Sequence, residues 1–251
     1  MKHALGSRVA ITGSRGFIGS HLKKRLEDDG HSIIEWDRNI GKPIEEFNTH
    51  DTDYVVHLAA NADVRASIKE PEAYWNNNVI NTTNIQRQCH YNHIPLLYAS
   101  SSCIHNWWLS PYGMSKKVNE ETAFENQVGL RFTTVYGEGA RDTMLIGRLL
   151  SGNISYLTDH IRDFIHVDDV VEAICLLMSK DIRLLKPVYD IGTGNGDLVY
   201  LLGKTAGFGD LPIMSGDACE AENNTADNTD LLELGWKPTV DVKKYLKEKK
   251  L

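Results

Sequence analysis

A glycine-rich turn near the N-terminus constrains the fold of this chain more than any other feature. Residues Arg8–Thr12 fit a short buried strand, and Gly13-Ser14-Arg15-Gly16-Phe17-Ile18-Gly19 follows at once. Beyond the turn, Ile18, Leu22 and Leu26 recur every four residues, which is the spacing of one apolar stripe on a helix. A strand, a glycine turn and a helix in this order are typical of the phosphate-binding corner of a dinucleotide-binding sheet.

Each glycine of this turn has a physical role. Gly13 allows a sharp turn, Gly16 keeps side chains away from a pyrophosphate, and Gly19 lets the helix pack close to the sheet. Free N–H groups and a partial positive charge at the helix N-terminus attract the phosphates. We expect the dinucleotide to contact this turn, namely Gly13, Arg15, Gly16, Phe17, Ile18 and Gly19.

An acidic residue ends the second predicted strand. His31–Trp36 fits a strand, and Asp37 follows it, about twenty residues beyond the glycines, where an acid accepts hydrogen bonds from the adenosine ribose. A carboxylate there repels a 2′-phosphate, so the sequence favours NAD over NADP. Arg38 weakens that preference, and Asp37 is alternatively a turn residue that caps the strand.

Strands and helices alternate over the first half of the chain. Continuous apolar runs predict buried strands over Tyr54–Ala60, Ile94–Ala99 and Val128–Thr134, and Glu72–Tyr91 predicts a helix after Pro71. The pattern predicts an α/β fold, a doubly wound parallel sheet of the Rossmann type with a small C-terminal substrate lobe. We expect residues 1–134 plus about 160–192 to form the dinucleotide-binding domain, and 135–159 plus 193–251 the lobe.

Two further residues of this pattern have ordinary structural interpretations. His57, inside an apolar strand, is expected to be a hydrogen-bonded core histidine. Asp168 is expected to be the N-cap of the helix that carries Val170, Ala173, Ile174 and Leu177 on one face.

A tyrosine and a lysine form the strongest catalytic signal. In the stretch Ser110-Pro111-Tyr112-Gly113-Met114-Ser115-Lys116, helical geometry places Tyr112 and Lys116 on one face. A nearby ammonium stabilises a phenolate, which makes Tyr112 a candidate proton acceptor near neutral pH. The preceding strand ends at Ser100-Ser101-Ser102-Cys103, where open α/β sheets bind ligands. Taken alone, the pair also fits a solvated surface and the serines also fit a loop.

Composition excludes several other classes of protein. The net charge is −7 and no basic run suggests binding to nucleic acid. Four scattered cysteines indicate neither a zinc site nor a disulfide framework, so we expect no metal and a reducing cytoplasm. Met1–Gly6 is too short and polar for a signal peptide, and no apolar stretch is long enough to span a membrane.

Taken together, these motifs resemble the extended short-chain dehydrogenase/reductase family, specifically its NAD-dependent nucleotide-sugar epimerases and dehydratases. The resemblance runs from about Arg8 to about Gly194. It rests on Thr12-Gly13-x-x-Gly16-x-x-Gly19, Asp37, His57-Leu58-Ala59-Ala60, Ser67-x-x-x-Pro71, Asn78 with Thr82, Ser100-Ser101, Tyr112-x-x-x-Lys116, Tyr136-Gly137, Arg162-Asp163-Phe164-Ile165-His166-Val167-x-Asp169 and Ile191-Gly192-Thr193-Gly194.

The resemblance implies roles for individual residues. Tyr112 would be the general acid/base, Lys116 would hold the nicotinamide ribose and tune Tyr112, and Ser101 would be the active serine. Arg162 would meet the nucleotide diphosphate. The resemblance also implies NAD as cofactor, a nucleotide-sugar substrate and a homodimer. Further contacts would come from Leu58, Ala59, Ala60 and Asn78 to the cofactor, and from Ser101, Ser102, Cys103 and Thr134 to the substrate.

Departures from the family pattern narrow the reaction. The dehydratase subgroup has an Asp-Glu pair where this chain has Ser102 and Cys103, which argues against dehydration. Ser101-Ser102-Cys103-Ile104 instead resembles GDP-fucose synthases and GDP-mannose 3,5-epimerases. The His or Lys that partners the cysteine in those enzymes is not evident, because Thr143, Met144 and Leu145 lie in that region, so we expect Cys103 to be a packed strand-end cysteine. We therefore expect C4 epimerisation of a UDP-hexose through a keto-sugar. The alternatives are a GDP-sugar 3,5-epimerase or reductase that uses Cys103, and a non-catalytic dinucleotide-binding regulator.

Overall fold

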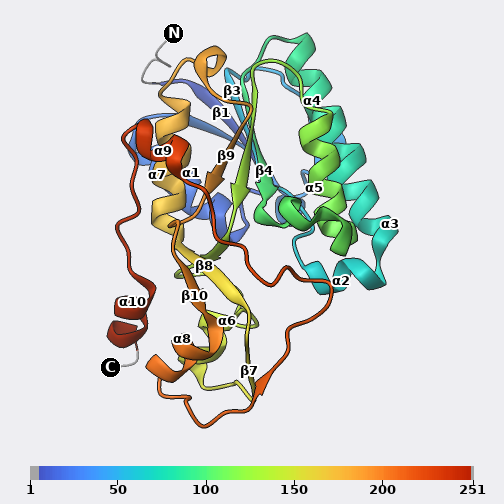
Figure 1. Cartoon of the computed structure of the whole chain (residues 1–251). Coiled ribbons are helices and arrows are strands. Elements are labelled where there is room, and N and C mark those ends of the chain that lie inside the picture. The colour runs from blue at the N-terminus through green and yellow to red at the C-terminus, as the bar shows by residue number, and fades with distance from the viewer. Residues whose placement is uncertain (1–5, 250–251) are drawn as a thin grey trace.

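A six-stranded parallel sheet forms the centre of the molecule, as the alternating pattern predicted (Figure 1). The structure is a computed structural model that describes residues 6–249, so Met1–Leu5 of the N-terminal segment considered above lies outside the described residues. In spatial order the strands are β2 (Ser32–Trp36), β1 (Arg8–Thr12), β3 (Tyr54–His57), β4 (Leu96–Ser101), β5 (Gln127–Phe132) and β9 (Val188–Ile191).

Helices cover both faces of this sheet, which makes it doubly wound. Figure 1 shows α1 (Phe17–Asp28) and α7 (Val167–Met178) on one face, and α4 (Thr82–Tyr91) and α5 (Pro111–Glu121) on the other. Successive strand residues point to opposite faces. Val9 and Ile11 therefore pack with the core beneath α1 and α7, while Ala10 packs with the core beneath α4. Burial on both faces explains why the strands are continuous apolar runs.

The helix predicted over Glu72–Tyr91 is interrupted. After α2 (Val64–Lys69), the chain forms α3 (Pro71–Tyr74), then a π-helical stretch over Trp75–Asn81, and then α4. The wider turn of a π-helix shifts the side chains that follow it around the axis. This stretch contains the three consecutive asparagines and buries Asn78 completely.

A smaller lobe lies beyond the carboxyl ends of the central strands (Figure 1). β6 (Thr134–Tyr136), β8 (Ile161–His166) and β10 (Gly196–Leu198) form a three-stranded sheet, and β7 (Leu157–Thr158) pairs with β11 (Ile213–Met214). The predicted strand Val128–Thr134 is thus divided: β5 ends at Phe132, and Thr134 begins a strand of the second sheet. The remaining helices are α6 (Leu145–Ser151), α8 (Val199–Thr205), α9 (Thr229–Glu233) and α10 (Val242–Lys249).

The predicted division into a dinucleotide-binding domain and a lobe stays a prediction. β8 falls within the range expected for the first domain and pairs with β6 and β10, whereas α7 directly after it packs into the core of the central sheet. Among residues 6–249, every helix is too short or too polar to cross a membrane.

The predicted N-cap of α7 was wrong by two residues. His166 is the N-cap, because its Nδ1 accepts a hydrogen bond from the backbone N–H of Asp168 at 3.3 Å. Asp168 lies in the first turn and contributes its negative charge to the helix N-terminus.

Candidate active site

The glycine turn packs so closely that side chains have no room. Gly13 has φ +69°, and a Cβ there would lie 2.8 Å from the backbone nitrogen of Ala59 on the neighbouring strand end. A Cβ on Gly19 would lie 2.0 Å from the carbonyl oxygen of Gly13. This contact holds the start of α1 against the end of β1, so the helix N-terminus lies at the corner where the phosphates of a dinucleotide would bind.

A cavity of about 380 Å³ opens beside the turn. Gly13, Gly16 and Asp37 line it on one side, and residues 58–61 line it on another. Asp37 is nearly buried, and its carboxylate accepts hydrogen bonds from the backbone N–H of Arg15 at 3.0 Å and of Asn39 at 2.9 Å. It therefore caps the turn and also borders the cavity. A glycine corner, a strand-end carboxylate and a cavity between them fit a dinucleotide.

Buried polar contacts join β1, β3 and α4 under this cavity. The His57 imidazole lies between the hydroxyls of Thr12, at 2.6 Å from Nδ1, and Thr82, at 2.9 Å from Nε2. Burial, with a smaller contribution from the charge of Lys116, lowers the pKa of His57 to about 3. The histidine is therefore neutral and structural, as the sequence predicted.

Asn78 supports the cavity from behind. Its side chain is fully buried and hydrogen-bonds to both backbone groups of Asn61, which directly follows Ala60 in the cavity lining. It also donates to the Ser115 hydroxyl at 3.2 Å, and its own carbonyl accepts from Asn119 at 2.8 Å. The structure thus places Asn78 between the cofactor cavity and the helix that carries the tyrosine and lysine.

Helix α5 brings Tyr112 and Lys116 to the carboxyl end of β4. Ser110 caps the helix by accepting from the N–H of Gly113 at 3.0 Å, and Pro111 occupies the first turn. Tyr112 and Lys116 are 8% and 3% exposed, so neither belongs to a solvated surface pair. The Lys116 ammonium lies 5.8 Å from the centre of the Tyr112 ring and donates to the carbonyl of Ala99 at 2.8 Å.

Ser101 meets the tyrosine from the strand. Its hydroxyl forms a hydrogen bond with the Tyr112 phenol that lowers the tyrosine pKa. It also accepts from the backbone N–H of Cys103 at 3.2 Å, which fixes the direction of the side chain. The expected convergence of a serine, a tyrosine and a lysine is therefore present.

The expectation of a phenolate near neutral pH is not met by the protein alone. Burial raises the pKa of Tyr112 well above its ordinary value, and this effect outweighs the hydrogen bond from Ser101 and the charge of Arg141. Burial also lowers the pKa of Lys116, to about 8, because a charged ammonium loses hydration inside the protein. Without its cofactor, the site holds a protonated phenol.

Cys103 lies at the same strand end. Burial raises the pKa of its thiol, and a negative charge on this thiol would raise the pKa values of both Tyr112 and Lys116. The thiol is therefore protonated at neutral pH and lies near Ser101, Tyr112 and Lys116. Within residues 6–249, no group of His, Cys, Asp or Glu side chains is arranged to hold a metal ion.

A second cavity, of about 280 Å³, lies between the central sheet and the lobe. Thr134 and Arg162, two of the residues predicted to contact substrate, line it, whereas the predicted residues Ser101, Ser102 and Cys103 are not among its lining residues. Asn224 links two predicted substrate residues, because its Nδ2 donates to Thr134 Oγ1 at 3.2 Å and to Ser102 Oγ at 3.4 Å. Sequence reasoning missed Asn224, and it also missed three arginines that line the cavity, Arg65, Arg141 and Arg148. Isolated residues in polar segments carry no local pattern that would single them out.

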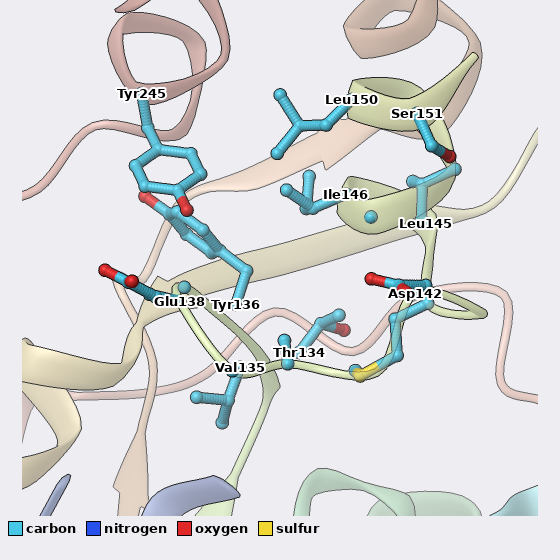
Figure 2. A pocket seen from close by; sticks show the side chains of 15 residues that line it. Thr134, Val135, Tyr136, Glu138, Asp142, Leu145, Ile146, Leu150, Ser151 and Tyr245 are labelled. Atoms are coloured by element: carbon cyan, nitrogen blue, oxygen red, sulfur yellow. The ribbon is translucent and has the colours of Figure 1, made fainter. Parts of the chain in front are cut away.

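A neighbouring cavity of about 370 Å³ lies behind strand β6 and shares Thr134, Met144 and Leu145 with this cleft. Figure 2 shows the rings of Tyr136 and Tyr245 facing Ile146 and Leu150 of α6 across it. Tyr136 and Tyr245 pack edge to face at 5.1 Å. Tyr245 of helix α10 therefore forms one side of this cavity. The opposite cavity, which Arg162 lines, lies across the shared residues Thr134, Met144 and Leu145.

The fold and the site together define a class of protein: a dinucleotide-dependent enzyme with a Rossmann-type sheet, in which a buried tyrosine, a lysine and a serine converge at the end of a central strand. The chain belongs to the NAD dependent epimerase/dehydratase family, whose model matches residues 9–192. The resemblance noted in the sequence is thereby confirmed. The cofactor is NAD, as the Asp37 argument predicted, and the substrates of this class are nucleotide sugars.

Several known proteins are similar to this chain. Protein CapI of Staphylococcus aureus is 33% identical, covering 69% of this chain and 70% of CapI. A putative UDP-glucose 4-epimerase of Methanocaldococcus jannaschii is 27% identical, covering 95% of this chain and 96% of the relative. The structure of MoeE5 in complex with UDP-glucuronic acid and NAD has a TM-score of 0.83 and 27% identity, covering 96% of both chains.

Proposed function

We propose that this protein inverts C4 of a UDP-hexose through a keto-sugar intermediate. The observation that carries the proposal is the convergence of Ser101, Tyr112 and Lys116 at the carboxyl end of β4. Arg141, which lines the neighbouring arginine-rich cleft, lies close enough to lower the pKa of Tyr112. Similarity to a putative UDP-glucose 4-epimerase and to MoeE5, solved with UDP-sugars, supports a UDP-linked substrate.

The chain's own residues would handle the proton of the sugar hydroxyl. Tyr112 would take the proton of the 4-hydroxyl and return it after inversion, while Ser101 holds both oxygens by hydrogen bonds. Lys116, Tyr112 and the cavity beside Gly13 and Asp37 would hold the cofactor. Bound NAD supplies reversible oxidation of the sugar carbon, and its oxidised ring adds a positive charge that favours the phenolate.

The charge of the cleft bears on which hexose is used. Arg141 lines the cleft, and its positive charge lowers the pKa of Tyr112. A guanidinium at this position would pair with a carboxylate on the sugar ring. We therefore propose that UDP-hexuronic acids are turned over alongside, or in preference to, neutral UDP-hexoses, in line with the UDP-glucuronic acid bound to MoeE5.

Turnover assays with NMR detection test the function. The protein would be incubated separately with UDP-glucose, UDP-galactose and UDP-glucuronic acid, and product spectra would be compared for inversion at C4. We expect a C4 epimer without net change in the redox state of bound NAD. Absence of any C4 epimer from protein that carries NAD would reject the proposal.

One alternative has a specific observation in its favour. The thiol of Cys103 borders Tyr112 and Lys116, so it could exchange a carbon-bound proton of a keto-sugar. In that case a GDP-sugar incubated in deuterated water would acquire deuterium at C3 or C5, and Cys103→Ala would abolish the exchange. A non-catalytic regulator would instead keep its biological activity in Tyr112→Phe.

We further propose a cytoplasmic homodimer that forms through two helices, one of which is α5, the helix that holds Tyr112. Large apolar side chains are exposed on this side, namely Trp75, Ile80 and Met114, at 45%, 47% and 41%. Light scattering should give twice the chain mass, and Met114→Glu should shift the protein toward the monomer. A monomeric mass for the unaltered protein would reject this assembly.

A further inference from the structure

Two arginines from opposite sides of the substrate cleft share one carboxylate. Arg65 lies on α2, beside the central sheet, and its Nε donates to Glu220 Oε1 at 2.8 Å. Arg162 lies on β8 of the lobe, and its Nη2 donates to Glu220 Oε2 at 3.0 Å. Each oxygen of Glu220 thus accepts from a different arginine.

Glu220 belongs to the long connection between β11 and α9. Figure 1 shows this connection passing beside α2 on its way back to the central sheet. Asp217, on the same connection, has its carboxylate 3.6 Å from Arg65 Nε. The Glu220 side chain is 22% exposed, so it lies at the surface of the cleft and water can reach it.

The cleft is otherwise strongly cationic. Arg65, Arg141, Arg148 and Arg162 all line it, together with His160, whereas Glu220 and Asp63 are its lining carboxylates. Two guanidiniums held on one anion attract any competing anion of suitable size. A diphosphate has two charged groups, so it can accept from one arginine on each side as Glu220 does.

We propose that Arg65 and Arg162 together form the diphosphate clamp of the nucleotide sugar, and that Glu220 is an internal anion which the diphosphate displaces. This inference rests on the proposed function, since it names how the nucleotide-sugar site is held. The proposal adds Arg65 to the residues that bind the substrate. It also implies that the connection 215–223, which carries Glu220, moves away from the two arginines when the substrate binds.

Glu220 and the diphosphate compete in this arrangement, so removal of the Glu220 charge should tighten nucleotide binding. Calorimetric titration of the whole protein with UDP measures the affinity directly. We expect Glu220→Gln to lower the Kd for UDP by roughly tenfold, the scale of one hydrogen bond to a charged group. Glu222→Gln is the matched control, because Glu222 lies two residues away on the same connection and offers Arg162 only its backbone carbonyl.

The partner arginine gives an independent measurement. Arg65→Ala should raise the Kd for UDP by roughly tenfold, while Lys69→Ala on the same short helix should leave it unchanged. In the Arg65→Ala background, Glu220→Gln should tighten UDP binding less than it does in the unaltered protein, because the two sites are coupled. Thermal unfolding of every variant verifies that the fold is retained.

The outcomes separate this inference from the proposed reaction. If Glu220→Gln weakens UDP binding or leaves it unchanged, Glu220 is not a competing anion and the inference is overturned. If Arg65→Ala leaves the Kd for UDP unchanged, Arg65 does not bind the diphosphate and the inference is likewise overturned. UDP binding that responds as expected, in protein that makes no C4 epimer, would support the clamp and reject only the proposed reaction.

Discussion

Asn78 and Asn61 form a reciprocal pair of hydrogen bonds between the π-helical stretch and the wall of the cofactor cavity. The Asn61 N–H donates to Asn78 Oδ1 at 2.8 Å, and Asn78 Nδ2 donates to the Asn61 carbonyl at 2.9 Å. This pair mimics the pairing of two strands, and it continues the cavity wall beyond the end of β3. The wall therefore depends on a side chain that never reaches the cavity itself.

Replacement of Asn78 should accordingly weaken both the fold and cofactor binding. Asn78→Ala leaves the backbone groups of Asn61 without partners, which should lower the free energy of unfolding by roughly 1–3 kcal/mol. Loss of NAD during gel filtration should accelerate. Asn84→Ala, at an exposed site on α4, is the control and should change neither quantity. Unchanged NAD retention in Asn78→Ala would contradict this role.

Gly19 should tolerate no side chain. Gly19→Ala would place a methyl group 2.0 Å from the carbonyl oxygen of Gly13, so α1 must move away from β1. We expect roughly 1–3 kcal/mol of destabilisation and loss of measurable NAD binding. Gly209→Ala is the control, since its methyl would meet only the flexible side chain of Lys204. Calorimetric titration with NAD measures the affinity of each variant. If Gly19→Ala binds NAD as tightly as the unaltered protein does, the close-packing argument is wrong.

The buried charge of Lys116 should lower the free energy of unfolding at neutral pH. Burial lowers its pKa from 10.5 to about 8, so the native state holds an unfavourable charge below pH 8. Between pH 8 and 10.5 the unfolded chain keeps a proton that the native lysine has lost, and the stability of the protein rises through that range.

Lys116→Met should therefore be inactive yet about 2 kcal/mol more stable at pH 7. Most of the advantage should be gone by pH 10.5, because there the native lysine is deprotonated and only about half of the unfolded lysines still carry a proton. Urea unfolding at both pH values measures the difference. A variant that is less stable at pH 7 would show that the hydrogen bond to Ala99 outweighs the cost of burying the charge.

Tyr112→Phe should separate catalysis from binding. In the proposed reaction the phenol carries the proton transfer, so its removal should lower kcat by at least about a hundredfold. Packing against Tyr74, at 6.3 Å between ring centres, is kept by phenylalanine, so stability and NAD content should change little. Tyr91→Phe, at a tyrosine that is 73% exposed, is the control for the substitution itself. Retention of most of the activity would remove Tyr112 from the mechanism.

An ion-pair network should couple α5 to the central sheet. Arg131 on β5 donates to both oxygens of Glu120 on α5, at 2.8 and 2.7 Å, and Ser100 donates to the same carboxylate at 2.6 Å. Glu120→Gln should cost roughly 2–4 kcal/mol, because it leaves a partly buried guanidinium without its main partner. Glu120→Gln combined with Arg131→Met should recover part of that loss. Additive effects in denaturant titrations would contradict the coupling.

Short-range patterns were sufficient to predict the central layers. The apolar runs and the four-residue stripe of α1 arise from burial on both faces of a parallel sheet, and this requirement leaves a periodic trace in the sequence. The same reasoning identified His57 as a neutral core residue. It failed where local alternatives have similar energies: the N-cap of α7 moved to His166, and one expected strand was divided between two sheets.

By itself, the sequence determined the fold class and which groups are the candidates for the chemistry, because glycines, Tyr112 and Lys116 at fixed spacings meet local stereochemical requirements. Only the tertiary structure decided their environment. Burial, which depends on every layer packed around a side chain, raised the pKa of Tyr112 and lowered that of Lys116. The tertiary structure also brought Arg65, Arg162 and Glu220 together from three distant segments, and no local pattern records such a meeting.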